Sequence, residues 1–304
     1  QKQMAAQERD SMLRTIMDAH ESDMTTFYKL VRRQRGDGLD DQTKIIKFKH
    51  DPSGGDPQIE NWATYYQQLA TPVDLSHMDP WFQRHYDLKR KLIRLIAPPT
   101  PSPMLQPSSI LKFINSLKNG KAVDPYGVGA EHIKHAHPTI VDIITKIVNN
   151  TFTSLEIPDS LKLGTITPVY KRKGTKDSPD NYRRITVNSM IGKIVDMAKV
   201  PGTRETLLAK SSPNQFGFRV GVSCAHAAVL LTEVYMEAAD NYTPLYVSYM
   251  DSSKAFDRVN HNSMLCTLYD QGIDQNLWKL YDSAYTGLCS KVKWGGNLSD
   301  KTII

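Results

Sequence analysis

Apolar and polar residues alternate along this chain at helical spacing in its first half, and at both helical and strand spacing in its second half. Helical spacing runs through residues 1–35, IENWATYYQQLA, RHYDLKRKLIRLIA, SSILKFINSLKNG, TIVDIITKIVNNTFTSLEIP and residues 223–239, 262–271 and 275–289. Apolar positions three and four residues apart place one stripe of a helix against a core. The pattern therefore predicts a folded chain with many amphipathic helices.

Strand spacing begins after residue 160. The arms of GTITPVYKRKGTKDSPDNYRRITVNS flank a tip rich in Gly, Lys and Asp, which predicts a β-hairpin over residues 164–187. LYVSYM alternates up to Asp251 and predicts a strand with this carboxylate at its carboxyl end. SKVKWGGNLSDKTII predicts a second hairpin that turns at Gly295 and Gly296. Strands gathered in the second half indicate an α+β fold.

The Pro-rich stretch PPTPSPMLQP predicts a linker at residues 98–108. Proline lacks the N–H group that helices and sheets use, so such a run does not continue either structure. Residues 1–97 then form a mostly helical extension, and a second region begins at residue 109.

Positive charge is concentrated in one part of the chain. The whole sequence has 38 Lys and Arg against 32 Asp and Glu, whereas residues 161–204 alone have ten against three. Lys171, Arg172 and Lys173 end one arm of the predicted hairpin, and Arg183 and Arg184 begin the other. The hairpin would bring these cations together to bind a triphosphate or a nucleic-acid backbone. A solvated surface loop is the alternative, and these residues alone favour it.

Three cysteines without C-x-x-C spacing argue against a disulfide framework or a zinc site. No run approaches 18 apolar residues, and the first residues are charged and polar, so we expect no membrane span and no signal peptide. These features predict an intracellular protein, in the nucleus, the cytoplasm or both. Because the chain begins with Gln, we expect it to be a piece of a longer protein.

Two stretches in the second half contain candidate functional residues. NQFGFRVGVS places Gly217 and Arg219 in a turn before a helix, where backbone and one guanidinium could contact a ligand. Asp251 could bind Mg²⁺, which prefers carboxylate and carbonyl oxygens together with substrate phosphates. Each stretch also fits an ordinary turn, and Asp251 alone fits a carboxylate that caps one.

Taken in order, these segments resemble the reverse transcriptase of a non-LTR (LINE-type, jockey-like) retrotransposon. The resemblance covers residues 109–304 and is carried by LEIPDSLKLGTITPVYKRKG, NYRRITVNSMIGKI, QFGFRVGVS, YMDSSKAFDRVNH, LYDQGI and SKVKWGGNLS. Residues 1–97 resemble, more loosely, the segment between the endonuclease and polymerase regions of that family. The implied fold is that of a right-hand polymerase, with fingers at 109–243 and the start of the palm at 244–304.

The resemblance also implies roles for individual residues. Asp251 would be a catalytic carboxylate and a metal ligand, Ser252 would bind the same Mg²⁺ through its carbonyl, and Phe256 would lie under the sugar and reject a ribose 2′-OH. The implied nucleotide-binding residues are Lys171, Lys173, Arg183, Gln215, Gly217 and Arg219. Asp257 would be structural. The implied substrates and partners are an RNA template, a DNA primer or target, and dNTPs.

The chain departs from the family pattern at several points. Arg184 stands where the family has Pro after Tyr-Arg, and the sequence stops before the family's Gln-Gly and Tyr-x-Asp-Asp segments. We therefore expect a truncated domain with an incomplete Mg²⁺ site that does not polymerise by itself. One alternative is a nucleic-acid-binding remnant or domesticated fragment without catalysis. Another is a decayed reading frame with no role.

Overall fold

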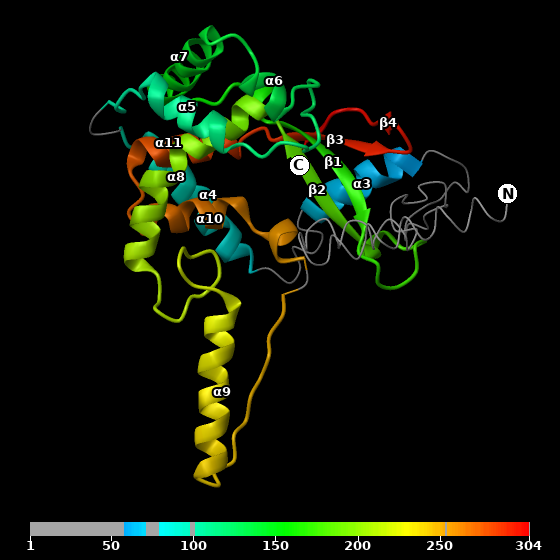
Figure 1. The fold of residues 1–304 in the computed structure, drawn as a ribbon, viewed down its shortest axis with the longest axis vertical. Coiled ribbons are helices and arrows are strands. Elements are labelled where there is room, and N and C mark those ends of the chain that lie inside the picture. The colour runs from blue at the N-terminus through cyan, green and yellow to red at the C-terminus, as the bar shows by residue number, and fades with distance from the viewer. Residues whose placement is uncertain (1–57, 71–78, 98–100, 253, 304) are drawn as a thin grey trace, which may run out of the picture. The chain divides into compact units, whose positions relative to one another are not determined.

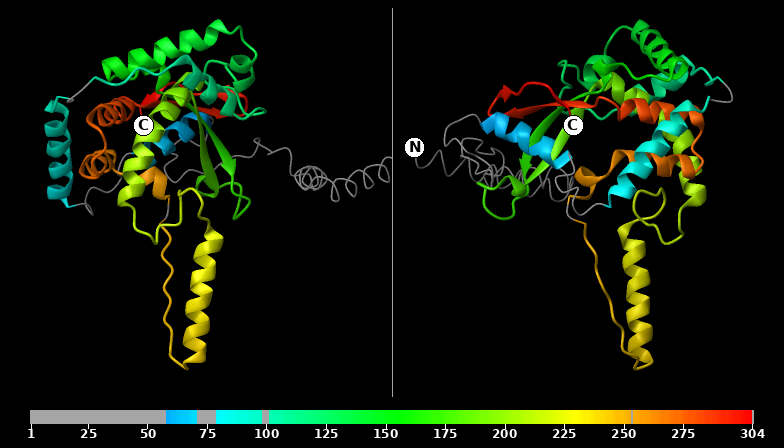
Figure 2. Two further views of the ribbon diagram at one scale, coloured as in Figure 1. Left: turned by 60° about the vertical axis from the view of Figure 1, so that its left-hand side comes forward. Right: turned by 180° about the vertical axis from the view of Figure 1, so that it is seen from behind.

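The computed structural model describes residues 58–70, 79–97, 101–252 and 254–303. The predicted helix at residues 1–35 lies outside these ranges. The described residues fall into two compact units: a short one of residues 169–183 and a large one containing the rest. Helices and a small mixed sheet make up the structure, which confirms the α+β class (Figures 1 and 2).

The elements follow in chain order. The helices are α3 (Gln58–Ala70), α4 (Pro80–Leu95), α5 (Pro107–Ser116), α6 (Ala130–Lys134), α7 (Thr139–Ser154), α8 (Met190–Lys210), α9 (Cys224–Asp240), α10 (His261–Asp270) and α11 (Gln275–Ala284). The short 3₁₀ helices are η2 (Asp159–Leu161), η3 (Pro179–Asn181) and η4 (Ala255–Arg258). The strands are β1 (Leu163–Tyr170), β2 (Tyr182–Asn188), β3 (Cys289–Trp294), β4 (Asn297–Leu298) and β5 (Thr302–Ile303).

The sheet has the strand order β2-β1-β3-β4, and β5 pairs with the free part of β3. β1 and β2, the two arms of the predicted basic hairpin, are neighbours. β1 runs parallel to β3, with Leu163 opposite Cys289, a pairing between segments about 120 residues apart that local patterns do not predict. β3 and β4 form the hairpin predicted at Gly295 and Gly296, whose positive φ angles of 56° and 87° suit the tight turn.

One hydrophobic core lies among α5, α7 and α8. Ile114, Val148 and Ile194 are almost completely buried in it. Asp124 closes its edge, because one carboxylate oxygen accepts from the N–H groups of Tyr126 and Val128 and the other accepts from the Met190 N–H at the start of α8. The loop before α6 is thereby tied to the first turn of α8.

A second core joins α4 to α10 and α11. Ile93, Leu265 and Trp278 are at most 3% exposed, and the Trp278 indole N–H donates to the Leu265 carbonyl at 2.7 Å. The upstream helix α3 packs in turn against β3, where Trp62 lies 5.3 Å from Trp294 between ring centroids. The helices α3 and α4 therefore belong to the same compact unit as β3, α10 and α11.

The strand predicted at Leu245–Met250 is wrong. Residues 244–252 form no regular secondary structure and run beside α9, with the Tyr235 and Tyr249 hydroxyls 3.1 Å apart (Figures 1 and 2). A strand needs hydrogen-bonded neighbours, and no described strand pairs with this segment. Tyr246 and Met250 are more than 90% exposed.

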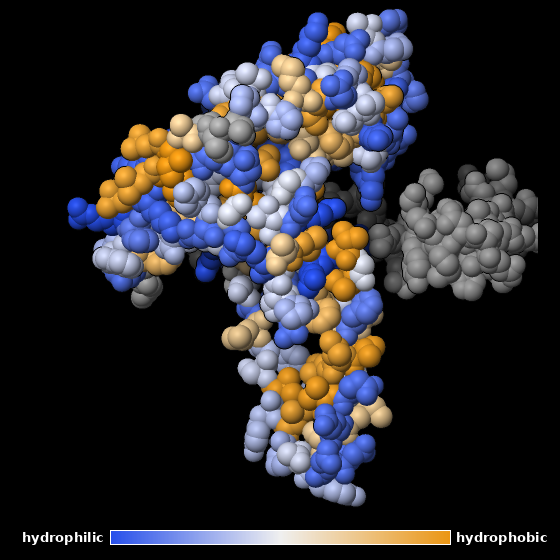
Figure 3. All heavy atoms as spheres, turned by 90° about the vertical axis from the view of Figure 1, so that its left-hand side faces the viewer, coloured by the Kyte–Doolittle hydropathy of each residue, from blue (hydrophilic) through white to orange (hydrophobic). Residues whose placement is uncertain are grey.

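Helix α9 presents apolar side chains to solvent. Val229, Leu230 and Met236 are each more than half exposed, and no described residue of α9 is buried. Figure 3 shows orange groups along the lower part of the molecule, where α9 lies in Figure 1. No helix in the described ranges is both long and apolar enough to span a membrane.

We predict that Gly192→Ala lowers the free energy of unfolding by about 1–3 kcal/mol. A Cβ atom at Gly192 would lie 2.7 Å from the carbonyl oxygen of Leu161, and this backbone oxygen has no freedom to rotate away. Urea denaturation followed by circular dichroism measures the change.

Gly202→Ala in the same helix is the matched control. Its Cβ atom would meet only the end of the flexible Leu277 side chain, and alanine favours a helix over glycine by about 0.5–1 kcal/mol. Equal denaturation midpoints for the two variants would contradict the close approach of α8 to Leu161.

Candidate functional site

The hairpin tip forms the short unit of residues 169–183. The Lys171 backbone N–H donates to the Asn181 carbonyl at 2.7 Å, and the Lys171 ammonium donates to the Asp180 carbonyl at 2.7 Å. Lys171 therefore helps to close the tip, and two of its three ammonium hydrogens remain for a ligand. Lys173 and Arg183 are exposed.

Part of the predicted basic surface is engaged in ion pairs within the large unit. The pairs are Lys162 with Asp159, Arg184 with Asp257, and Lys199 with Asp196. Lys199 is only 2% exposed and lies 4.7 Å from the ring centroid of Tyr281. The cations that remain exposed near the hairpin are therefore fewer than the sequence count suggests.

The segment before α9 is a turn held by its own side chains. The Arg219 guanidinium donates to the carbonyls of Ser212 and Gln215 at 3.1 and 3.3 Å, and the Gln215 amide donates to the Gly217 carbonyl at 3.1 Å. Two of the predicted nucleotide-binding residues thus shape this turn. The Phe218 side chain in this turn is 95% exposed, and its backbone has a positive φ angle of 62°.

The turn after Met250 contains the remaining predicted site residues. Asp251 and Ser252 are exposed, and η4 follows with Phe256 80% exposed. The Phe256 ring meets the Phe218 ring edge to face, with centroids 6.3 Å apart at 89°. The structure therefore brings the 215–219 turn and the turn around η4 together through two exposed aromatic rings. Sequence reasoning had not assigned a role to Phe218.

Two side chains of η4 and its N-cap bind other elements. The Asp257 carboxylate pairs with the Arg184 guanidinium of β2 at 3.0 Å. The Lys254 ammonium donates to the Tyr65 hydroxyl of α3 at 3.0 Å and lies 5.2 Å from the centroid of its ring. Asp257 thus contacts β2 and Lys254 contacts α3, two contacts that the sequence did not indicate.

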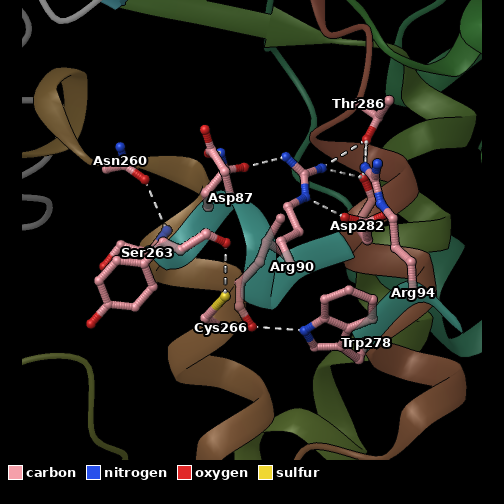
Figure 4. A network of polar contacts seen from close by, with 12 residues as sticks. Asp87, Arg90, Arg94, Asn260, Ser263, Cys266, Trp278, Asp282 and Thr286 are labelled. Atoms are coloured by element: carbon pink, nitrogen blue, oxygen red, sulfur yellow. Dashed lines mark hydrogen bonds and ion pairs between the residues drawn. The ribbon is translucent and has the colours of Figure 1, made fainter. Parts of the chain in front are cut away.

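The residues that follow η4 are fixed by a polar network between α4, α10 and α11 (Figure 4). The Asp282 carboxylate pairs with Arg90 and Arg94 at 2.6 Å each, and the Asn262 side chain binds both Asp87 and Arg90. The Asn260 side chain accepts from the Ser263 N–H and caps α10 immediately after η4.

His261, the first residue of α10, lies close to this network. Burial, followed by the nearby Arg90 and Arg184 cations, lowers the pKa of His261 below its usual value. The imidazole is therefore neutral at pH 7, and it stacks at a tilt on Tyr285, with 4.8 Å between ring centroids.

The described residues do not complete a Mg²⁺ site at Asp251. Mg²⁺ needs about six oxygen ligands, and no three His, Cys, Asp or Glu side chains group together in the part of the chain that the structure describes. Asp251 and the Ser252 carbonyl would supply one carboxylate and one carbonyl oxygen to such an ion.

An open cavity of about 740 Å³ borders α11, and Arg94, Asp159, Lys162 and Thr286 are among its lining residues. None of the predicted site residues lines it. The aromatic pair and the turn around η4 therefore define the candidate site by exposure and chemistry rather than by a closed pocket.

Residues 171–301 match the family model described as reverse transcriptase (RNA-dependent DNA polymerase). The match includes every predicted site residue.

The chain is similar to three proteins of Drosophila melanogaster. It is 25% identical over 51% of its length to the retrovirus-related Pol polyprotein from a type-2 retrotransposable element. It is 26% identical over 43% to the probable RNA-directed DNA polymerase from transposon BS, and 23% identical over 67% to that from transposon X-element. Residues 171–301 are therefore similar to a reverse transcriptase domain, and the chain is similar to proteins of retrotransposons. It spans 14%, 14% and 22% of the lengths of these curated relatives.

Proposed function

We propose that this chain is part of an RNA-directed DNA polymerase of a non-LTR retrotransposon. Such an enzyme transfers nucleotides from dNTPs to the 3′-OH of a DNA primer paired with an RNA template. The main support for the proposal is the family match over residues 171–301. Asp251 and the contacting rings of Phe218 and Phe256 lie within this match. We further propose that the parent protein acts inside the cell, in the nucleus, the cytoplasm or both.

In this proposal each part of the site has its own role. Lys171, Lys173 and Arg183 bind the triphosphate, because exposed cations at a hairpin tip suit phosphate oxygens. Phe256 lies under the sugar of the incoming nucleotide, where a bulky ring excludes a 2′-hydroxyl by size. Gln215, Gly217 and Arg219 hold the turn that presents Phe218 to the template and nucleotide.

Asp251 is proposed as a catalytic carboxylate and, with the Ser252 carbonyl, as a Mg²⁺ ligand of the parent enzyme. A bound divalent ion would polarise phosphate oxygens and stabilise negative charge in the transition state. Asp251 is exposed, and Phe256 follows five positions later in the 3₁₀ helix η4.

A second candidate function is nucleic-acid binding without polymerisation. The observation that favours it is that no three His, Cys, Asp or Glu side chains group together, at Asp251 or elsewhere, among the described residues. Polymerases need several carboxylates to hold two metal ions, and each missing ligand weakens the stabilisation of the transition state.

The double variant Lys171→Gln and Lys173→Gln should bind an RNA–DNA primer–template more weakly. Each lysine that contacts a phosphate releases counterions, so the slope of log K against log salt concentration should become shallower by about 2. Fluorescence anisotropy of a labelled primer–template over a salt series measures both affinity and slope.

The matched control is Lys112→Gln with Lys118→Gln, which removes the same charge from exposed positions at α5 and just beyond its end. The control should bind like the wild type. An equal loss in both double variants would show that net charge, and not the hairpin tip, determines binding.

Primer extension separates the two candidate functions. We expect no template-dependent incorporation by the 304-residue chain above the level of its Asp251→Ala variant, because one carboxylate does not hold two metal ions. The exposed Asp240→Asn at the end of α9 is the control substitution. Extension by the wild type that disappears in Asp251→Ala but persists in Asp240→Asn would overturn the non-polymerising candidate.

A further inference from the structure

The turn of η4 separates its anchoring side chains from its exposed ring. Lys254 and Asp257 are three residues apart, which places them on the same side of a 3₁₀ turn, and both bind neighbouring elements. Phe256 lies on a different side and is 80% exposed. The backbone turn that carries the ring is therefore anchored by the side chains of Lys254 and Asp257, and the ring itself contacts Phe218.

The contact of η4 with β2 is an ion pair between Asp257 and Arg184, and both side chains are largely shielded from water. The side chains of Arg184 and Asp257 are 21% and 24% exposed, with 3.0 Å between nitrogen and oxygen. Ion pairs that are mostly shielded from water are screened less by salt than surface pairs. The Asp257 N–H also donates to the Lys254 carbonyl at 3.0 Å, so the residue that pairs with Arg184 is also hydrogen-bonded within the turn.

Strand β2 gives its two adjacent arginines different surroundings. Successive side chains of a strand point to opposite faces, and Arg183 is exposed whereas Arg184 is partly buried. The charge of Arg184 also acts on His261, whose pKa it helps to lower. Arg184 is thus held among the residues that flank η4 and does not face solvent as Arg183 does.

We propose that Arg184 is a positioning residue that fixes the Phe256 ring through its ion pair with Asp257, and so determines discrimination between dNTPs and rNTPs. This inference rests on the proposed function, in which Phe256 contacts the sugar. Arg184 stands where the resemblance predicts proline, which has no side chain able to make this pair. If the pair is lost, η4 loses its ion pair to β2 and keeps the Lys254–Tyr65 contact, and the ring occupies a wider range of positions.

The first test observes the ring without any ligand. The full chain is prepared with 4-fluorophenylalanine at its eight phenylalanines, and Phe256→Leu assigns the fluorine resonance of residue 256. Arg184→Ala and Asp257→Ala should each shift or broaden the resonances of Phe256 and Phe218 and leave that of the buried Phe152 unchanged. Arg184→Lys should preserve most of the wild-type spectrum.

Arg258→Ala is the matched control, because it removes an exposed guanidinium from η4 itself. Its spectrum should equal that of the wild type. A Phe256 resonance that does not respond to Arg184→Ala, or that responds equally to Arg258→Ala, overturns the positioning role.

The second test measures nucleotide selectivity in the complex of the chain with an RNA template and a DNA primer. A 2-aminopurine next to the templating base reports binding of the complementary dNTP and rNTP. Arg184→Ala and Asp257→Ala should each reduce the ratio of the two affinities by about threefold to tenfold, and the double variant should reduce it no further, because the two residues act as a pair.

The outcomes of the second test are distinct. An unchanged ratio in both single variants, with a lowered thermal midpoint only, would reduce the pair to a structural contact and overturn the inference. A wild-type chain that does not bind the primer–template overturns the proposed function, and the fluorine spectra still decide whether Arg184 positions Phe256.

Discussion

The Asp282 carboxylate lies between Arg90 and Arg94, and this shared ion pair attaches α4 to α11. Asp282 and Arg90 are 12% and 14% exposed, so removing one partner would leave a charge poorly solvated, a loss of about 3 kcal/mol. The more exposed ion pair between Lys89 of α4 and Asp270 of α10 contributes less than about 1 kcal/mol to stability. The attachment of α4 therefore depends on Asp282 together with the apolar contacts of Ile93 and Trp278.

The segment around η4 depends on that attachment. α10 begins immediately after η4, is capped by Asn260, and packs on α4 through Leu265 and Cys266. From the other side, α3 packs on β3 through Trp62 and reaches Lys254 through Tyr65. Two helices upstream of the family match thus support the turn that presents Phe256. A reverse transcriptase domain cut at the boundaries of that match would lose both supports.

The sequence predicted most helices and the Gly295–Gly296 hairpin, because each depends on local spacing and turn residues. It did not predict α8, whose Pro201 argues against a helix, or the parallel pairing of β1 with β3, which joins distant segments. It also assigned Leu245–Met250 to a strand, since apolar alternation does not reveal whether a partner strand is present. The resemblance indicated Asp251 and Phe256, whereas Phe218, Arg184 and Tyr65 act through contacts across the fold that no spacing along the chain reveals.

We propose that residues 215–219, 251–252 and 254–258 form the place where an incoming dNTP meets a primer–template. Hydrogen–deuterium exchange of the chain bound to an RNA–DNA primer–template tests it most directly, with the complementary dNTP compared with a non-complementary one. We expect only the complementary dNTP to increase the protection of the backbone amides in both segments, residues 215–219 and the residues around η4. Protection that is absent from both segments, or equal for the two nucleotides, would contradict it.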